Sequence, residues 1–125
     1  MTIQEALDIA DDMKPNMMKR NLKIRHLQDI EQIIHEELLM THEHTPEEEE
    51  KPEYNEGTDP GTVLYAPDPH SMVYVYWLMT KIDMQAQEDD RYNIDRAHFE
   101  NEYSQLSDWW TRNKMPVQKT REFRI

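Results

Sequence analysis

Residues 68–84 read DPHSMVYVYWLMTKIDM, and the conformation of this stretch decides the fold class. Residues 73–76 of this stretch read VYVY, an alternation that is also compatible with a β-strand. Two features favour a helix. The opening Asp-Pro pair matches a capping residue followed by proline at the first helical position, where a missing N–H costs nothing. Trp77 and Met84 then continue the face of Val73 at helical spacing.

The helical pattern continues downstream. Residues 70–114 contain no glycine or proline, and apolar side chains recur there at spacings of 7, 4, 3 and 4: Tyr92, Phe99, Tyr103, Leu106 and Trp110. Between the two runs, the sequence QAQEDDR is polar on every side. We expect two helices, over residues 70–88 and 91–113, with a break or kink near residues 88–90. One continuous helix is the alternative.

Two more helices are predicted upstream. Thr2 and Glu5 form a capping box at the start of the first helix, and Pro15 ends it. A second helix is expected over about residues 19–41, because five apolar residues fall on one helical stripe: Ile24, Leu27, Ile30, Ile34 and Leu38. The sequence therefore predicts an all-α fold, a small bundle of about four helices.

Two segments lie outside the predicted helices. Residues 43–67 contain prolines, both glycines and four consecutive glutamates, so we interpret them as a long, mobile, solvated acidic loop. Residues 63–65 are expected to form a short extended piece within it. Residues 114–125 carry four basic residues and one acidic residue. We expect them to be an extended basic C-terminal tail on a helical domain of residues 1–113.

Composition excludes several classes of function. The formal net charge of the 125 residues is −12, which argues against a free nucleic-acid-binding domain. The chain has no cysteine, so it holds no disulfide, thiolate zinc site or cysteine nucleophile. The longest apolar run, residues 73–79, is too short to span a bilayer, and we expect no membrane partner. The first twelve residues are acidic and amphipathic, unlike a signal peptide.

Metal and catalytic patterns are weak. His35, His42 and His44 are the closest histidine cluster, but HEELL lacks the second histidine of a zinc-protease motif. The acidic pairs at residues 36–37 and 89–90 come nearest to the acidic helices of magnesium-dependent nucleotide pyrophosphohydrolases. The first pair lies among apolar residues and the second on the polar break, so a solvated acidic face is the preferred interpretation. We expect no enzyme activity, no metal and no cofactor.

The aromatic residues divide into core and surface candidates. Seven residues are predicted to form the core: Leu27, Ile30, Ile34, Trp77, Phe99, Tyr103 and Trp110. Apolar residues surround the helix over residues 72–79, and the adjacent Trp109 and Trp110 cannot share one helical face. A domain this small is not expected to cover all of that surface. We therefore predict that Tyr74 and Trp109 contact another subunit.

Several blocks of sequence, in this order, carry a family resemblance: KIRHL at 23–27, TDPGTVLYAPDP at 58–69, VYVYWLMTKID at 73–83, RYN at 91–93, the F-x-x-x-Y of 99–103 and the terminal Met-Pro. The chain resembles the small head–tail connector proteins of long-tailed bacteriophages, also called adaptor or head-completion proteins. The likeness spans about residues 3–116. The chain departs from the family pattern in the long acidic stretch of residues 46–56 and in the extended tail.

The resemblance implies a structural virion protein, made in the bacterial host cytoplasm and incorporated in the neck of the particle. Such proteins form a twelve-fold ring beneath the portal protein and offer a surface to a stopper or tail-completion protein. Genomic DNA passes through the channel without specific binding. The tail is then expected to clasp the portal or the adjacent subunit, with five contact residues: Lys119, Arg121, Phe123, Arg124 and Ile125.

Two other classes stay open. An acidic phage-encoded inhibitor that mimics DNA would explain a charge of −12 at this length. Its acids should be spread at phosphate-like spacing, whereas residues 43–60 alone hold eight acids and one base. A small metal-dependent hydrolase is the third hypothesis. Mg²⁺, Mn²⁺ or Zn²⁺ binding would be its signature.

Overall fold

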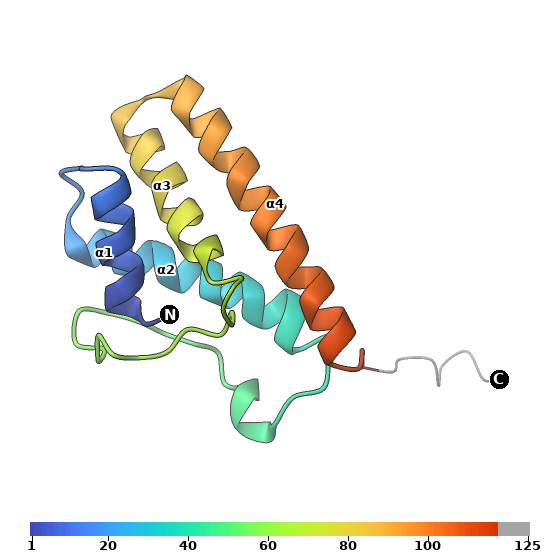
Figure 1. Ribbon diagram of the computed structural model, residues 1–125. Coiled ribbons are helices and arrows are strands. Elements are labelled where there is room, and N and C mark those ends of the chain that lie inside the picture. The colour runs from blue at the N-terminus through green and yellow to red at the C-terminus, as the bar shows by residue number, and fades with distance from the viewer. Residues whose placement is uncertain (118–125) are drawn as a thin grey trace.

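The computed structural model describes residues 1–117, which form four α-helices and no strand (Figure 1). The helices are α1 (Ile3–Met13), α2 (Arg20–Ile34), α3 (Met72–Ala86) and α4 (Asp89–Asn113). α2 continues into one π-helical turn, η1 (His35–Leu39), and a 3₁₀ turn, η2 (Pro46–Glu49), follows. The prediction of a small all-α bundle is confirmed.

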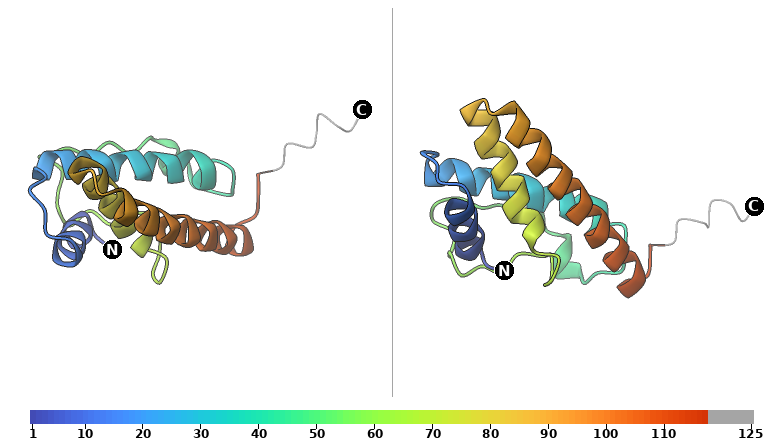
Figure 2. Two further views of the ribbon diagram at one scale, coloured as in Figure 1. Left: turned by 90° about the horizontal axis from the view of Figure 1, so that it is seen from above. Right: turned by 45° about the horizontal axis from the view of Figure 1, so that its top comes forward.

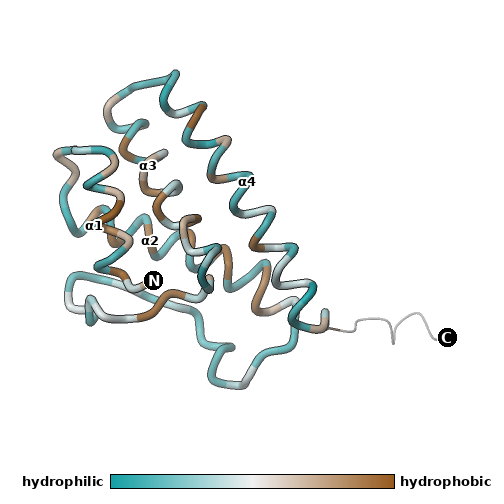
Figure 3. Tube along the Cα trace, in the orientation of Figure 1, coloured by the Kyte–Doolittle hydropathy of each residue, from teal (hydrophilic) through white to brown (hydrophobic). Residues whose placement is uncertain are grey.

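α3 lies at the centre of the bundle. In Figure 1, α1, α3 and α4 lie side by side, with α3 in the middle, and α2 crosses behind them. The two further views in Figure 2 show α2 as a separate layer. Because α1, α2 and α4 all contact it, α3 is buried on nearly every side. We call residues 43–67 the long connection. In Figure 3, the outer helix α4 and the long connection are mostly hydrophilic, which agrees with a core centred on α3.

The ends of α1 follow the sequence signals. The Thr2 hydroxyl accepts a hydrogen bond from the Glu5 N–H at 3.1 Å, and the Glu5 carboxylate accepts one from the Thr2 N–H at 3.0 Å. The helix ends at Met13, just before Pro15. The carbonyls of Thr62 and Pro60, each at 3.0 Å, accept hydrogen bonds from the first N–H groups of α1. The long connection therefore completes this helix.

α3 and α4 are separate helices, as the polar break predicted. Gln87 ends α3 in the left-handed conformation, with φ 57° and ψ 40°, and α4 begins two residues later. The start of α3 differs from the prediction. Asp68 does not cap the helix; its carboxylate accepts a hydrogen bond from the Ser71 hydroxyl within a turn, and α3 begins only at Met72.

The predicted core residues lie in or against the core. Leu27, Ile30 and Ile34 are fully buried on α2. Trp77, Phe99 and Trp110 are also buried, and Tyr103 is partly buried against them. Within residues 1–117, no helix combines the length and the apolar character that crossing a membrane requires.

The expectation of surplus apolar surface around residues 72–79 is wrong. Tyr74 has no exposed surface, and Val75 and Leu78 are equally buried. α1, α2 and α4 surround this stretch, and Leu64 and Ala66 from the long connection complete its cover. Tyr74 is therefore a core residue and presents no surface to another subunit.

Candidate functional site

Residues 43–67 are mostly exposed, as predicted, but hydrogen bonds anchor them to α2 and η1 at several points. Four polar side chains on one face of α2 and η1 point toward this segment: Gln28, Glu31, Gln32 and His35. Gln28 accepts a hydrogen bond from the Tyr54 N–H at 2.9 Å, Gln32 donates to the Pro52 carbonyl at 2.8 Å, and a His35 ring nitrogen lies 2.7 Å from the Glu48 carbonyl. We call these four residues the α2 polar stripe. The hydrogen bonds of the α2 polar stripe correct the prediction that residues 43–67 are mobile.

The centre of the α2 polar stripe is a fully buried carboxylate. The Tyr74 hydroxyl donates to Glu31 Oε1 at 2.6 Å, and the Tyr54 hydroxyl and the Tyr65 N–H donate to Oε2 at 3.1 and 2.9 Å. The Tyr74 oxygen also accepts a hydrogen bond from the Ala66 N–H at 2.8 Å. Burial raises the pKa of Glu31 to about 7, although the three hydrogen bonds favour its charged form. One side chain thus joins α2, α3 and the long connection.

Sequence reasoning missed this site. Glu31 lies on the same predicted helix as the acidic pair of residues 36–37, and the solvated acidic face predicted for that pair does not extend to it. The available signal was the recurrence of polar residues at 28, 31, 32 and 35, which is a second helical stripe beside the apolar one. The tyrosines that would serve as its donors lie 23 to 43 positions away in sequence.

A second buried charge cluster lies at the other end of α3. The Lys14 amine is 2.5 Å from Asp83 Oδ1 and 2.9 Å from Asp95 Oδ2. Burial would lower the pKa of Lys14, but the hydrogen bonds that its amine donates to the two carboxylates, together with their negative charges, outweigh burial and raise the pKa. Burial and the nearby Asp95 raise the pKa of Asp83, against the effect of Lys14. The cluster ties the end of α1 to α3 and α4.

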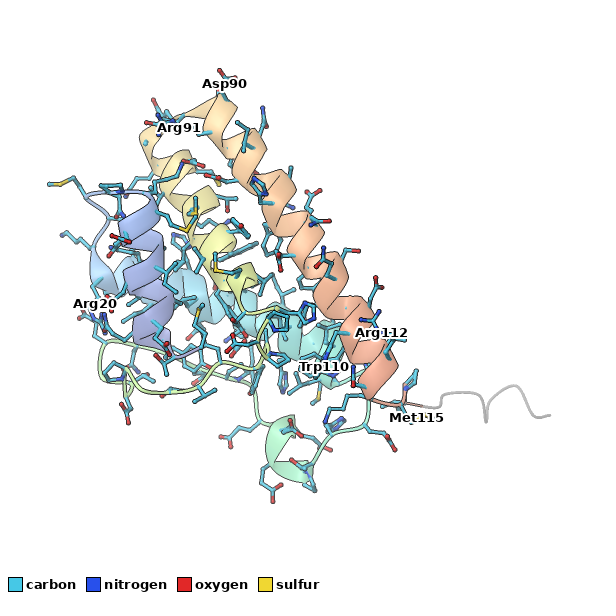
Figure 4. All side chains as sticks on the ribbon, viewed as in Figure 1. Arg20, Asp90, Arg91, Trp110, Arg112 and Met115 are labelled. Carbon is cyan, nitrogen blue, oxygen red and sulfur yellow. The ribbon has the colours of Figure 1, made fainter. Side chains whose placement is uncertain are left out.

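Above this cluster, three methionine side chains are exposed at the surface. Met13 is 49% exposed, Met17 98% and Met84 54%. Met13 and Met17 border a shallow pocket of about 550 Å³ that Ile82, Ala86 and Arg91 also line. Met84 lines a separate hollow with Asp89 and Tyr92. We call Met13, Met17 and Met84 the methionine end, because they lie at or near the C-terminal ends of α1 and α3. Arg91 marks this region in Figure 4, near the turn between α3 and α4, whereas Arg112 and Met115 lie at the opposite end of α4.

Exposed methionines are suited to contact with another protein, because their flexible apolar side chains adapt to a partner surface. The subunit contact predicted at Trp109 lies elsewhere, near the C-terminal end of α4. Trp109 is partly buried, with its ring edge-on to Trp110 at 5.6 Å. The predicted contact residues of the tail fall outside the described residues: Lys119, Arg121, Phe123, Arg124 and Ile125.

The histidines and acidic pairs do not converge. His35 bonds to the Glu48 carbonyl, a His42 ring nitrogen lies 2.8 Å from the Leu38 carbonyl, and His44 lies 3.2 Å from a Glu49 oxygen. Within residues 1–117, no three histidine or acidic side chains are placed to hold a metal ion. The pairs at residues 36–37 and 89–90 belong to η1 and to the first turn of α4, which lie far apart in Figure 1.

Comparison with known proteins adds no relative: no protein-family model, curated protein or solved structure matches the chain.

Proposed function

We propose that this protein is a structural component of a bacteriophage virion, a connector that forms a ring beneath the portal and joins head to tail. The observation that carries the proposal is the methionine end. Met13, Met17 and Met84 expose apolar surface on a domain whose interior is otherwise well covered. A heterologous ring needs such a surface on every subunit, because each one contacts its neighbour through a patch outside its own core.

The charge of the domain supports a role in a DNA channel. Residues 1–117 hold 25 acidic and 11 basic residues, a formal charge of −14. A wall of this charge repels the DNA backbone, so the duplex passes without binding. The proposed partners are the portal protein above the ring and a stopper or tail-completion protein below it. The protein would be made in the host cytoplasm and retained in the neck of the particle.

The tail supplies the proposed attachment to the portal or to the adjacent subunit. Its basic residues complement an acidic partner, and Phe123 and Ile125 would be the apolar anchors. The described residues stop at Val117, so this part of the proposal rests on the sequence. Removing residues 118–125 should abolish attachment to portal-bearing heads and leave the helical domain folded.

The deciding experiment counts copies of the protein in purified, DNA-filled virions by quantitative mass spectrometry. About a dozen copies per particle support the connector. A second arm tests the methionine end, with Met17→Glu expected to reduce incorporation into particles. Val63→Glu is the matched control, because Val63 is 68% exposed on the long connection. Absence from the particle would refute the connector and favour the acidic inhibitor, whose own test is displacement of DNA from host nucleases.

A further inference from the structure

A groove opens where the aromatic core reaches the surface between α2 and α4. Its volume is about 230 Å³, and six side chains line it: Ile33, Glu37, Trp77, Arg96, Phe99 and Tyr103. The ring centroids of Trp77 and Phe99 are 5.1 Å apart, and those of Phe99 and Tyr103 are 5.8 Å apart. The floor is therefore aromatic, and it has room for an apolar side chain from outside the helical domain.

The rim of the groove is acidic on the α2 side. Glu37 lines the groove and is exposed, as is its neighbour Glu36, and the Glu37 carboxylate accepts a hydrogen bond from the Tyr103 hydroxyl. Among the salt bridges of residues 1–117, neither glutamate has a cationic partner. The one cation that lines the groove, Arg96, is already paired with Glu100 at 2.8 Å. The unneutralised charge on this rim suits a basic occupant.

The end of the described chain lies beside this rim. The Val117 N–H donates to the Thr41 carbonyl at 2.8 Å, and the Glu43 N–H donates to the Met115 carbonyl at 2.8 Å. The Thr41 hydroxyl in turn donates to the Glu37 carbonyl at 2.6 Å. Residue 117 is thus held about one helical turn from the acidic rim.

The sequence beyond this point matches the groove. Residues 118–125 read QKTREFRI, with three basic residues and one acidic residue. In an extended chain, alternate side chains share one face, which puts Arg121, Phe123 and Ile125 together. Eight extended residues reach roughly 26 Å, more than the distance of a few helical turns.

We propose that residues 118–125 dock in the groove of their own chain, with Phe123 against Trp77 and Phe99 and with Arg121 beside Glu37. Docking within one chain is favoured because the short connection gives the tail a high effective concentration at the groove. This contact goes beyond the connector function and does not depend on it. In a connector, it would keep the tail from binding before the portal is met.

The test uses the full chain, which contains only two phenylalanines, Phe99 and Phe123, and no cysteine. Fluorine-labelled phenylalanine gives two NMR signals, and Phe123→Leu assigns them. Thr120→Cys provides a single position for a nitroxide spin label. We expect the label to broaden the Phe99 signal in dilute protein, and we expect removal of residues 118–125 to shift that signal.

Charge variants test the acidic rim. Glu37→Gln keeps an acceptor for the Tyr103 hydroxyl but removes the charge, so it should weaken the broadening of the Phe99 signal. Glu37→Lys should abolish it. Glu56→Lys, at an exposed position of the long connection, is the control and should change nothing.

Two results would overturn the proposal. One is a Phe99 signal that is unaffected by the spin label and by removal of the tail. The other comes from a mixture of two preparations, one carrying the spin label but no fluorine and one carrying fluorine but no spin label. If the Phe99 signal broadens in this mixture, the groove binds the tail of a second copy. Neither result bears on the copy number in virions, so the connector proposal is tested separately.

Discussion

Glu31 should make the protein less stable as the pH rises from about 4.5 to about 7. Its pKa is raised from the ordinary 4.5 to about 7 because the carboxyl is buried. A carboxyl whose pKa is higher in the folded than in the unfolded state stabilises the fold fully below its unfolded pKa. This stabilisation is lost as the pH rises through the folded pKa. The rise in pKa corresponds to about 3 kcal/mol.

The perturbation that isolates this effect is Glu31→Gln. Glutamine keeps the shape of the side chain and an oxygen that can accept from Tyr74, and it has no charge to desolvate. Other groups titrate in the same range, Asp83 among them, but they contribute equally to both proteins and cancel in the difference. The stability of the variant relative to wild type should therefore rise by about 3 kcal/mol between pH 4.5 and pH 8.

The assay is urea unfolding followed by circular dichroism at several pH values across this range. Urea is preferred to guanidinium because it adds no salt. Glu36→Gln is the control, because it makes the same substitution at an exposed position about one turn beyond. A Glu31→Gln difference that is flat with pH would refute the burial argument. A difference that falls with rising pH would mean that the three hydrogen bonds outweigh desolvation.

Three further predictions concern the buried residues, and urea unfolding measures each of them. Lys14→Met should lower the free energy of unfolding by about 3–5 kcal/mol, because it leaves two buried carboxylates without a cation. Adding Asp83→Asn should recover part of this loss. Strictly additive effects of the two substitutions would contradict a coupling between Lys14 and Asp83. Trp77→Ala should lower the free energy of unfolding by about 3–5 kcal/mol, and Trp109→Ala should lower it clearly less, because Trp109 is only partly buried. Tyr74→Phe should cost about 2–3 kcal/mol, since it removes a donor to Glu31 and an acceptor for a buried N–H; a neutral result would argue against the hydrogen bonds described for Glu31.

Local signals in the sequence predicted most of the fold. The apolar stripe of α2, the capping box of Thr2 and Glu5, and the polar break before α4 each depend on residues a few positions apart. Such patterns act through the geometry of a single helix, so they can be recognised without knowing what the helix packs against. The separation of α3 from α4 was correct for this reason.

The cover of α3 could not be predicted in the same way. Its apolar residues on all sides were interpreted as surplus surface, because a sequence shows which residues are apolar but not how many neighbours surround them. The structure supplies those neighbours from three helices and from Leu64 and Ala66. Glu31 shows the same limit. Its acidity was visible, but its burial depends on Tyr54, Tyr65 and Tyr74, which only the tertiary fold brings together.

The contacts of the long connection also predict an order of folding. The first two N–H groups of α1 donate to the carbonyls of Thr62 and Pro60. The Glu31 carboxylate on α2 accepts hydrogen bonds from donors at residue 54 and beyond. α3 and α4, by contrast, form a hairpin of neighbouring segments, and contacts of short sequence separation form fastest. During synthesis α1 and α2 leave the ribosome first, whereas the hydrogen-bond partners at residues 54–74 follow later. The first half of the protein is therefore expected to be assembled last, onto a helical hairpin made from the second half.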